Sequence, residues 1–329
     1  MTAQTQSRRR FLLGCATGAV AMGTAGLVAS RTEAARFAII GAGPAGVSAA
    51  HALRQAHPNA LIQIIERDPS RLSRTAAPQT AFAQPGLGLT AGDLDAAGIE
   101  LVIDDVTAID WDAGRVELFS RRQVIADQIL LAPGVAAREE AIEGLTPRSR
   151  HLWPAAWGSQ AEARRLSAQL AALEPGAHMV LRLPKGFDYA PEIIAHRAET
   201  LLRHSPNSKL TVLDGGLHSA AAPLVATRLA PRLSWVQDVT IHKIEPDRGM
   251  IDSSAGNLRA DLVNFVPQLG AAKLAQATGL TDPSGWCPCD QTGRSKLREN
   301  AIILGDAQQG ARRSLSQAAQ SGRAMPVTL

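Results

Sequence analysis

FAIIGAGPAG is the sequence of residues 37–46. Its four apolar residues predict a buried parallel strand, and Gly41 permits the tight turn out of that strand. Gly43 leaves room for the backbone to approach a pyrophosphate, and Gly46 lets the next helix, expected over 44–55, pack closely on the sheet. The N-terminal end of that helix carries a partial positive charge that favours phosphates. This pattern is typical of a unit that binds a dinucleotide.

A second apolar strand, expected at 61–65, is followed by Glu66. Dinucleotide-binding units carry an acid at the end of this strand. Glu66 follows Gly46 by about 20 residues. An acid at this distance accepts hydrogen bonds from a ribose 2′-hydroxyl and would repel a 2′-phosphate. The sequence therefore predicts a dinucleotide without that phosphate.

Two later strand ends distinguish FAD from NAD as the expected dinucleotide. ILLAPG, at 129–134, is an apolar strand followed by a turn that would return the chain toward a flavin. IILGD, at 302–306, is a strand that ends in Asp306, whose carboxylate would bind the ribityl hydroxyls of the flavin. Each pattern alone is common, but the three in this order predict FAD.

The first residues predict export from the cytoplasm. SRRRFL, at 7–12, fits a twin-arginine leader, and a Gly/Ala-rich apolar stretch follows it as far as Ala29. We expect residues 1–34 to form a twin-arginine signal peptide, with a cleavage site at Thr32-Glu33-Ala34, and the protein to be periplasmic. The alternative is that an uncleaved leader tethers the protein to the membrane.

The charge composition limits the classes of partner that the protein can be expected to bind. The chain has 34 Lys and Arg against 30 Asp and Glu, and the leader holds four Arg and one Glu, so the remainder carries a net charge of about +1. This balance does not favour nucleic acid as a partner.

Beyond the leader the only cysteines are Cys287 and Cys289. Two cysteines without paired histidines favour neither a disulfide framework nor a zinc site, so no metal is expected.

Several segments resemble the flavoprotein subunit of flavocytochrome c sulfide dehydrogenase, a family related to the sulfide:quinone reductases. The segments are DLVNFVP at 261–267, GLT at 279–281, GWCP at 285–288 and ILGD at 303–306. The similarity extends over most of residues 36–325. It implies an α/β fold of two dinucleotide-binding, Rossmann-like domains, of the type found in FAD-dependent pyridine-nucleotide-disulfide oxidoreductases.

The same resemblance implies a periplasmic FAD enzyme that oxidises a small sulfur substrate, sulfide, and passes electrons to a c-type cytochrome. A cysteine pair beside the flavin receives the sulfide in that family, and Cys287 would be one member of the pair. The residues expected to contact FAD are Gly41, Gly43, Pro44, Ala45, Gly46, Glu66, Arg67, Val106, Ala132, Gly134, Gly305 and Asp306.

The chain departs from that family at three places. The second cysteine should follow the strand expected at 178–183, but residues 184–191 read PKGFDYAP. Residues 67–90 lack the cysteine that attaches the flavin, so FAD would be held noncovalently. The chain ends at Leu329, shortly after a helix expected over 314–324, where relatives continue. Three alternatives follow for the thiols: a redox couple of Cys287 with Cys289, Cys287 acting alone, or no thiol chemistry.

The middle of the chain predicts a second nucleotide-binding half without its phosphate loop. A strand at 178–183, a helix at 190–204 and a strand at 209–214 follow one another, but residues 184–188 lack a Gly-x-Gly-x-x-Gly series. We therefore expect no NAD(P)H as a partner. The domains predicted are an FAD-binding domain in two parts, 35–150 and 252–329, and an inserted α/β domain at 151–251.

Other side chains are weaker candidates for chemistry. The turn after residue 183 could face the flavin or lie in solvent. Arg312 and Arg313, just before the helix at 314–324, could stabilise a reduced flavin. We expect histidines on the helix at 190–204 to be surface residues and the two nearby tryptophans to serve packing. These candidates are Lys185, Asp188, Tyr189, Arg312, Arg313, His196, His204, Trp153 and Trp157.

Overall fold

The computed structural model describes residues 34–74, 89–157, 159–186, 189–217 and 219–326. The chain divides into two units, residues 1–34 and 35–329, and the fold described below is that of the second unit. The predicted signal peptide therefore lies outside the described residues, apart from Ala34, and export stays a prediction.

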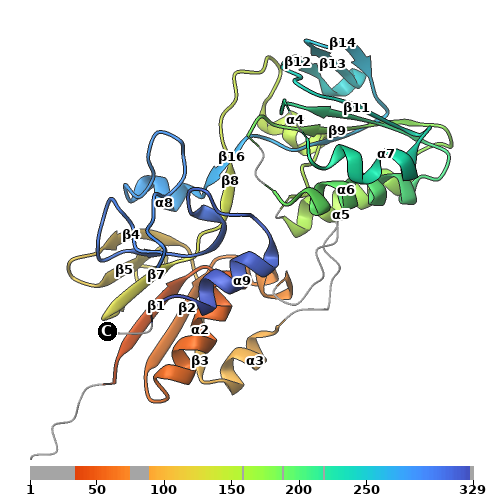
Figure 1. Ribbon diagram of the computed structural model, residues 1–329. Coiled ribbons are helices and arrows are strands. Elements are labelled where there is room, and N and C mark those ends of the chain that lie inside the picture. Colours follow the sequence, from red (N-terminus) through yellow and green to blue (C-terminus); the bar gives the residue numbers. More distant parts are fainter. Residues whose placement is uncertain (1–33, 75–88, 158, 187–188, 218, 327–329) are drawn as a thin grey trace, which may run out of the picture. The chain divides into compact units, whose positions relative to one another are not determined.

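The first sheet is parallel and contains the predicted βαβ unit (Figure 1). Its strands lie in the order β17 (Ile302–Ile303), β7 (Gln128–Leu131), β1 (Arg36–Ile40), β2 (Leu61–Glu66) and β3 (Ile99–Ile103). Helix α2 (Pro44–Ala56) connects β1 to β2. Because β1 and β7 are neighbours, the two turns that follow them lie at the same edge of the sheet.

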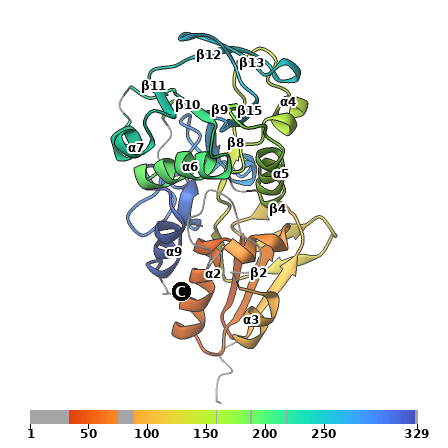
Figure 2. The same ribbon diagram turned by 90° about the vertical axis from the view of Figure 1, so that its right-hand side faces the viewer.

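Two layers cover this sheet. Phe37 and Ile39 of β1 face one hydrophobic cluster, which includes residues of the helices on that side, and Ala38 and Ile40 face another. The helices of the first face are α2, α3 (Ala91–Ala96) and α9 (Leu315–Arg323), and α9 packs against α2 (Figure 2). The opposite face carries an antiparallel sheet of β4 (Val106–Asp110), β5 (Arg115–Leu118) and β6 (Gln123–Ile125), together with helix α8 (Lys273–Ala277).

The second sheet repeats this arrangement. Its parallel strands lie in the order β11 (Leu233–Val236), β10 (Lys209–Asp214), β9 (His178–Leu183) and β15 (Leu262–Phe265). One face packs on α5 (Gln160–Ala171) and α6 (Pro191–His204), and α7 (Ala222–Leu229) contacts α6 and β11. The other face packs on the antiparallel strands β12 (Ile241–Glu245), β13 (Met250–Ser253) and β14 (Gly256–Arg259). Short 3₁₀ helices are η1 (Pro69–Arg74), η2 (Pro246–Arg248) and η3 (Gly305–Ala307).

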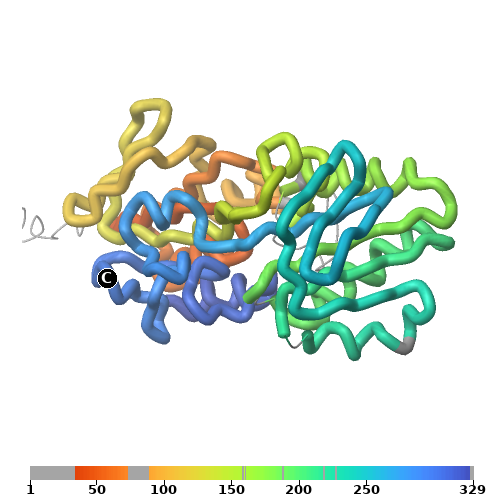
Figure 3. Tube along the Cα trace, turned by 90° about the horizontal axis from the view of Figure 1, so that it is seen from above, coloured from red at the N-terminus to blue at the C-terminus, as the bar shows by residue number. Residues whose placement is uncertain are grey.

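Two segments link the sheets. Strands β8 (Val135–Ala137) and β16 (Leu269–Ala271) pair in antiparallel orientation, and helix α4 (Pro147–Leu152) follows β8. In Figure 3, the yellow-green and blue parts of the tube trace the two linking segments. The second sheet takes β15 from beyond residue 251, so it extends past the boundary that the sequence predicted for the inserted domain. The reason is that β13 and β14 pack on this sheet, and the chain leaves it only after β15.

The fold class is confirmed: the described residues form an α/β structure with two parallel, Rossmann-like sheets. Among the described residues, no helix combines the length and the apolar character needed to cross a bilayer.

Candidate functional site

The turn between β1 and α2 has the shape that the glycine pattern predicts. Gly41 has a φ of 108°, and its N–H donates to the carbonyl of Ile65 over 2.8 Å. A Cβ atom at Gly41 would lie 2.2 Å from the carbonyl oxygen of Ala132, and one at Gly46 would lie 1.9 Å from the carbonyl oxygen of Gly41. At Gly43, in contrast, a Cβ atom would meet nothing within 4 Å. The structure therefore packs two of the glycines tightly and leaves open space in front of the third.

Glu66 lies beside this turn with its carboxylate fixed. The side chain is 6% exposed. One carboxylate oxygen accepts a hydrogen bond from the N–H of Ala42 (2.9 Å), and the other accepts one from the N–H of Asp68 (2.9 Å). Both bonds hold the acid at the end of β2, where it remains part of a cavity wall. This is the position from which an acid binds ribose hydroxyls.

A cavity of about 880 Å³ begins at this turn. Its size is within the usual range for small-molecule sites. The wall contains eleven of the residues expected to contact FAD: Gly41, Gly43, Pro44, Ala45, Glu66, Arg67, Val106, Ala132, Gly134, Gly305 and Asp306. Gly46 does not line it, because its role is the close contact with Gly41. The open space at Gly43 fits the diphosphate of a dinucleotide, and the buried acid Glu66 fits its adenosine ribose.

The other end of the cavity is aromatic and comes from the inserted segment. Trp157 and Tyr189 lie edge to face with ring centroids 4.9 Å apart. The Arg197 guanidinium stacks on Trp157 at 4.8 Å and donates to the Ala156 carbonyl over 2.8 Å. All three side chains line the cavity, and Arg197 is buried. Residues from both sheets therefore build one site.

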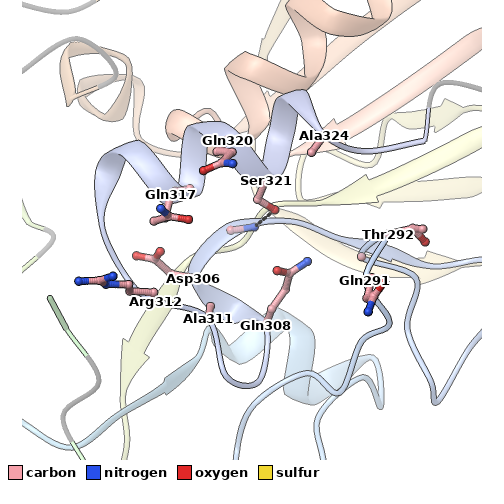
Figure 4. A pocket seen from close by; sticks show the side chains of 13 residues that line it. Gln291, Thr292, Asp306, Gln308, Ala311, Arg312, Gln317, Gln320, Ser321 and Ala324 are labelled. Carbon is pink, nitrogen blue, oxygen red and sulfur yellow. Dashed lines mark hydrogen bonds between the residues drawn. The ribbon is translucent and has the colours of Figure 1, made fainter.

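Asp306 lies between this cavity and a smaller one. The small cavity has a volume of about 220 Å³ and is bounded by α9, by the turn before it and by the loop at 291–293. Figure 4 shows Asp306 and Arg312 on the turn, with Gln317 and Gln320 on the helix. The N–H of Gly305 donates to the Ser321 hydroxyl over 3.0 Å, which fixes the end of β17 to α9. Asp306, predicted to bind the ribityl hydroxyls, thus lines both cavities.

Arg313 does not occupy the flavin-facing position considered from the sequence. It is 1% exposed and is absent from the wall of the large cavity. Its guanidinium lies 3.5 Å above the Trp286 ring, and its Nε donates to the Asp306 carbonyl over 3.1 Å. Arg312 lines the small cavity instead. The cause is tertiary packing, since Arg313 supports the turn after Asp306 from behind.

Neither cysteine lines the large cavity in the part of the chain that the structure describes. Both are free thiols, and Cys287 is completely buried in the cluster beneath the first sheet. Its N–H donates to the Ala307 carbonyl (2.9 Å) and its carbonyl accepts from the Gln309 N–H (2.8 Å). Burial, with a smaller contribution from Asp282, raises the pKa of the Cys287 thiol to about 12. Burial, with the neighbouring Cys287 and Asp290, raises the pKa of the Cys289 thiol to about 12.

These pKa values predict slow alkylation of the folded protein. The thiolate is the reactive form, and a raised pKa leaves little of it below pH 9. We expect both thiols of the folded protein at pH 8 to react at least tenfold more slowly with iodoacetamide than the same thiols in denaturant, and the rate to increase with pH. Mass spectrometry of labelled peptides measures both rates. Equal rates in the two states would contradict the burial seen here.

The remaining sequence candidates lie at several places. Tyr189 lines the cavity, whereas Lys185 is exposed on the turn after β9 and Asp188 lies outside the described residues. Nδ1 of His204 hydrogen-bonds the Thr200 carbonyl (2.8 Å). Trp153 stacks on Phe265 with centroids 6.2 Å apart, and also lines the cavity. No group of three His, Cys, Asp or Glu that could hold a metal occurs among the described residues.

Sequence reasoning missed the cavity residues Arg71 and Arg197. Arg197 sits among apolar residues of α6, and no local pattern indicates that its guanidinium turns toward Trp157. Arg71 comes five residues after Glu66, on a 3₁₀ helix that no apolar period predicts. The only signal in the sequence is that Arg71 follows Glu66 by five residues.

Comparison with known proteins agrees with this fold. Residues 35–168 match the model of a family described as pyridine nucleotide-disulphide oxidoreductase. The structure is similar to sulfide:quinone oxidoreductase from the hyperthermophilic bacterium Aquifex aeolicus, with a TM-score of 0.67 and 18% identity over 88% of this chain and 75% of that one. It is also similar to an NAD-dependent persulfide reductase from A. fulgidus, with a TM-score of 0.69 and 20% identity over 88% of this chain and 58% of that one.

Thioredoxin reductase from Lactococcus lactis gives a TM-score of 0.62 and 17% identity, over 88% of this chain and 96% of that one. The chain thus spans less than two thirds of the persulfide reductase but nearly all of the thioredoxin reductase. Identities this low show a shared fold. The described chain has the fold of the pyridine nucleotide-disulphide oxidoreductases, and residues 35–168 carry that family's sequence pattern. The narrower resemblance to the flavocytochrome c subunit stays a prediction.

Proposed function

We propose that the protein is an FAD-dependent oxidoreductase that oxidises sulfide or a related sulfur compound. The observation that carries the proposal is the one cavity that collects eleven of the residues expected to contact FAD. The sulfur substrate is supported by the resemblance in sequence and by two proteins of similar fold, whose names give them sulfide:quinone oxidoreductase and persulfide reductase activities.

Each part of the cavity has a distinct task in this proposal. FAD, when bound, supplies an acceptor for the two electrons that leave the sulfur compound. Glu66 would hold the adenosine ribose, and the N-terminal end of α2 would face the diphosphate. Asp306 would hold the ribityl hydroxyls, and Ser314 and Leu315, at the start of α9, line the cavity further along. The aromatic end, with Trp157 and Tyr189, would exclude water from the reacting face.

The position of the thiols supports an oxidation that does not pass through them. Cys287→Ser is expected to keep sulfide-dependent flavin reduction within about threefold of the wild-type rate, because a buried thiol outside the cavity does not meet the substrate. Stopped-flow absorbance of the anaerobic protein measures this rate. A loss of reduction in a variant that retains its FAD would restore Cys287 as a redox residue.

Compartment and electron acceptor are further parts of the proposal. The leader pattern at residues 7–12 supports a periplasmic protein that acquires FAD before export, and the resemblance supports a c-type cytochrome as the acceptor. A second candidate is a catalytically degenerate FAD-binding accessory protein of a sulfur-oxidation system. The absence of both cysteines from the described cavity wall favours this candidate over a thiol-dependent enzyme.

An anaerobic visible spectrum of the purified protein, recorded before and after the addition of sulfide, tests the proposal. A flavin band that bleaches supports sulfide oxidation through FAD. A flavin band that persists supports the accessory protein. No flavin band after reconstitution with FAD would overturn both candidates.

A further inference from the structure

Arg71 is a half-buried cation in the wall of the cavity, close to the glycine turn. It lies on η1, and its side chain is 30% exposed. Glu66, Gly43 and Gly134 line the same cavity. The Arg71 side chain therefore lines the same cavity as the open space at Gly43, so a ligand in that cavity could contact it.

Two distances fix the place of this guanidinium. Nε of Arg71 lies 3.8 Å from a carboxylate oxygen of Glu66, and Nη1 lies 4.0 Å from the position that a Cβ atom would take on Gly134. The other oxygen of Glu66 is bonded to the N–H of Ala42. Arg71 therefore lies between Glu66, which is bonded to the turn after β1, and the turn after β7.

Part of the hydrogen-bonding capacity of Arg71 is unused within the part of the chain that the structure describes. Its Nε is buried and has no hydrogen-bond partner among the described residues, and the 3.8 Å contact with Glu66 is too long for one. Buried donors in proteins are normally paired. A guanidinium presents five N–H donors in a planar fork whose geometry matches phosphate oxygens. Arg71 lines a cavity in which a bound ligand could supply an acceptor.

Other cations of the cavity wall are placed differently. Arg67 is 65% exposed and lies 3.8 Å from a carboxylate oxygen of Asp105. Arg150 donates to the Arg138 carbonyl over 3.2 Å, and Arg197 belongs to the aromatic end. Among the arginines of the described cavity wall, Arg71 is thus the one beside the acid that suits a ribose and the turn after β7.

We infer that Arg71 binds the diphosphate of the dinucleotide, with its guanidinium donating to the phosphate oxygens opposite the N-terminal end of α2. The inference rests on the proposed function in taking FAD as the natural ligand, but the chemistry recognised is an adenosine diphosphate group. Before the ligand binds, Glu66 supplies the nearest countercharge; once the ligand is bound, the diphosphate takes that place.

Calorimetric titration with ADP, and then with adenosine, tests this inference directly. Arg71→Met is expected to weaken ADP and FAD binding by about tenfold or more, while adenosine binding changes by less than about threefold. The ADP affinity of the variant should also decline less with added salt, because one ionic contact is lost. Arg71→Lys keeps the charge but lacks the planar fork of donors. Its ADP affinity should therefore lie between those of the wild type and Arg71→Met. The control is Arg148→Met, an exposed arginine outside the cavity that pairs with Asp247 at 2.9 Å.

Equal losses for ADP and adenosine, or no loss for either, in folded Arg71→Met or Arg71→Lys would overturn the role of Arg71. Failure of the wild-type protein to bind ADP would overturn it as well. The proposed function fails by a different result, the absence of sulfide-dependent flavin reduction in a protein whose ADP binding still depends on Arg71. Near-ultraviolet circular dichroism of each variant establishes that the comparison is made between folded proteins.

Discussion

Gly46→Ala is expected to destabilise the protein by about 3 kcal/mol or more, which corresponds to a fall in Tm of roughly 6–12 °C. The added methyl group would lie 1.9 Å from the carbonyl oxygen of Gly41 and 3.3 Å from a side-chain carbon of Ile39. The first of these atoms belongs to the backbone of the turn, so it cannot move aside without opening the contact between α2 and β1. Thermal unfolding followed by circular dichroism measures the change.

Gly43→Ala is the matched control for this substitution. It adds the same methyl group three residues away, where nothing lies within 4 Å and φ is −73°. Because Gly43 is also the N-cap of α2, where Ala is less favourable than Gly, the loss of stability in Gly43→Ala should be about 1 kcal/mol or less. Its FAD affinity should decrease, because the methyl group takes up the space left for the diphosphate. Equal destabilisation by both substitutions would show that the close contact at Gly46 is not what holds the helix.

Glu66→Gln is expected to weaken FAD binding by about 100-fold. Two ribose hydroxyls would donate to the carboxylate, each such bond to a charged acceptor contributes about 1.5 kcal/mol, and about 3 kcal/mol corresponds to two orders of magnitude. The amide keeps the volume of the side chain but lacks the charge. Titration of the apoprotein with FAD, followed by quenching of flavin fluorescence, gives the dissociation constants.

Glu100→Gln provides the comparison for this second variant. Glu100 lies on the neighbouring strand β3, accepts a hydrogen bond from the Gln63 amide over 2.8 Å and does not line the cavity. We expect its FAD affinity to match that of the wild type. An unchanged affinity in Glu66→Gln would mean that the acid serves only the two backbone N–H groups of Ala42 and Asp68.

The cavity has two ends with different chemistry. The end at the glycine turn consists mainly of backbone turns, the fixed acid Glu66 and Arg71, whereas the other end consists of aromatic side chains and Arg197. Strands β8 and β16 connect the sheets that supply them. Near them, Arg182 of β9 pairs with Glu140 at 2.5 Å and stacks on Phe265 at 4.7 Å. The ion pair with Glu140 ties the second sheet to the segment that leaves the first.

The sequence alone determined the turn between β1 and α2 and the acid beside it. Gly41, Gly43, Gly46 and Glu66 lie within one βαβ unit, whose turn depends on local backbone geometry and on hydrogen bonds between adjacent strands. Such a unit has nearly the same shape wherever its pattern occurs, so spacing suffices to predict it. The strand ends at Ala132 and Asp306 were predictable for a related reason, because parallel strands place their carboxyl ends at one edge of the sheet.

Only the tertiary structure decided where the sulfur atoms, the arginines and the aromatic wall lie. Cys287 is buried because its backbone pairs with the segment after Asp306, beneath the first sheet. Arg313 is covered by Trp286, and Trp157 meets Tyr189 through the packing of the inserted segment. These positions depend on contacts between residues far apart in the chain, and a local pattern of residue types does not specify which side of a segment becomes buried.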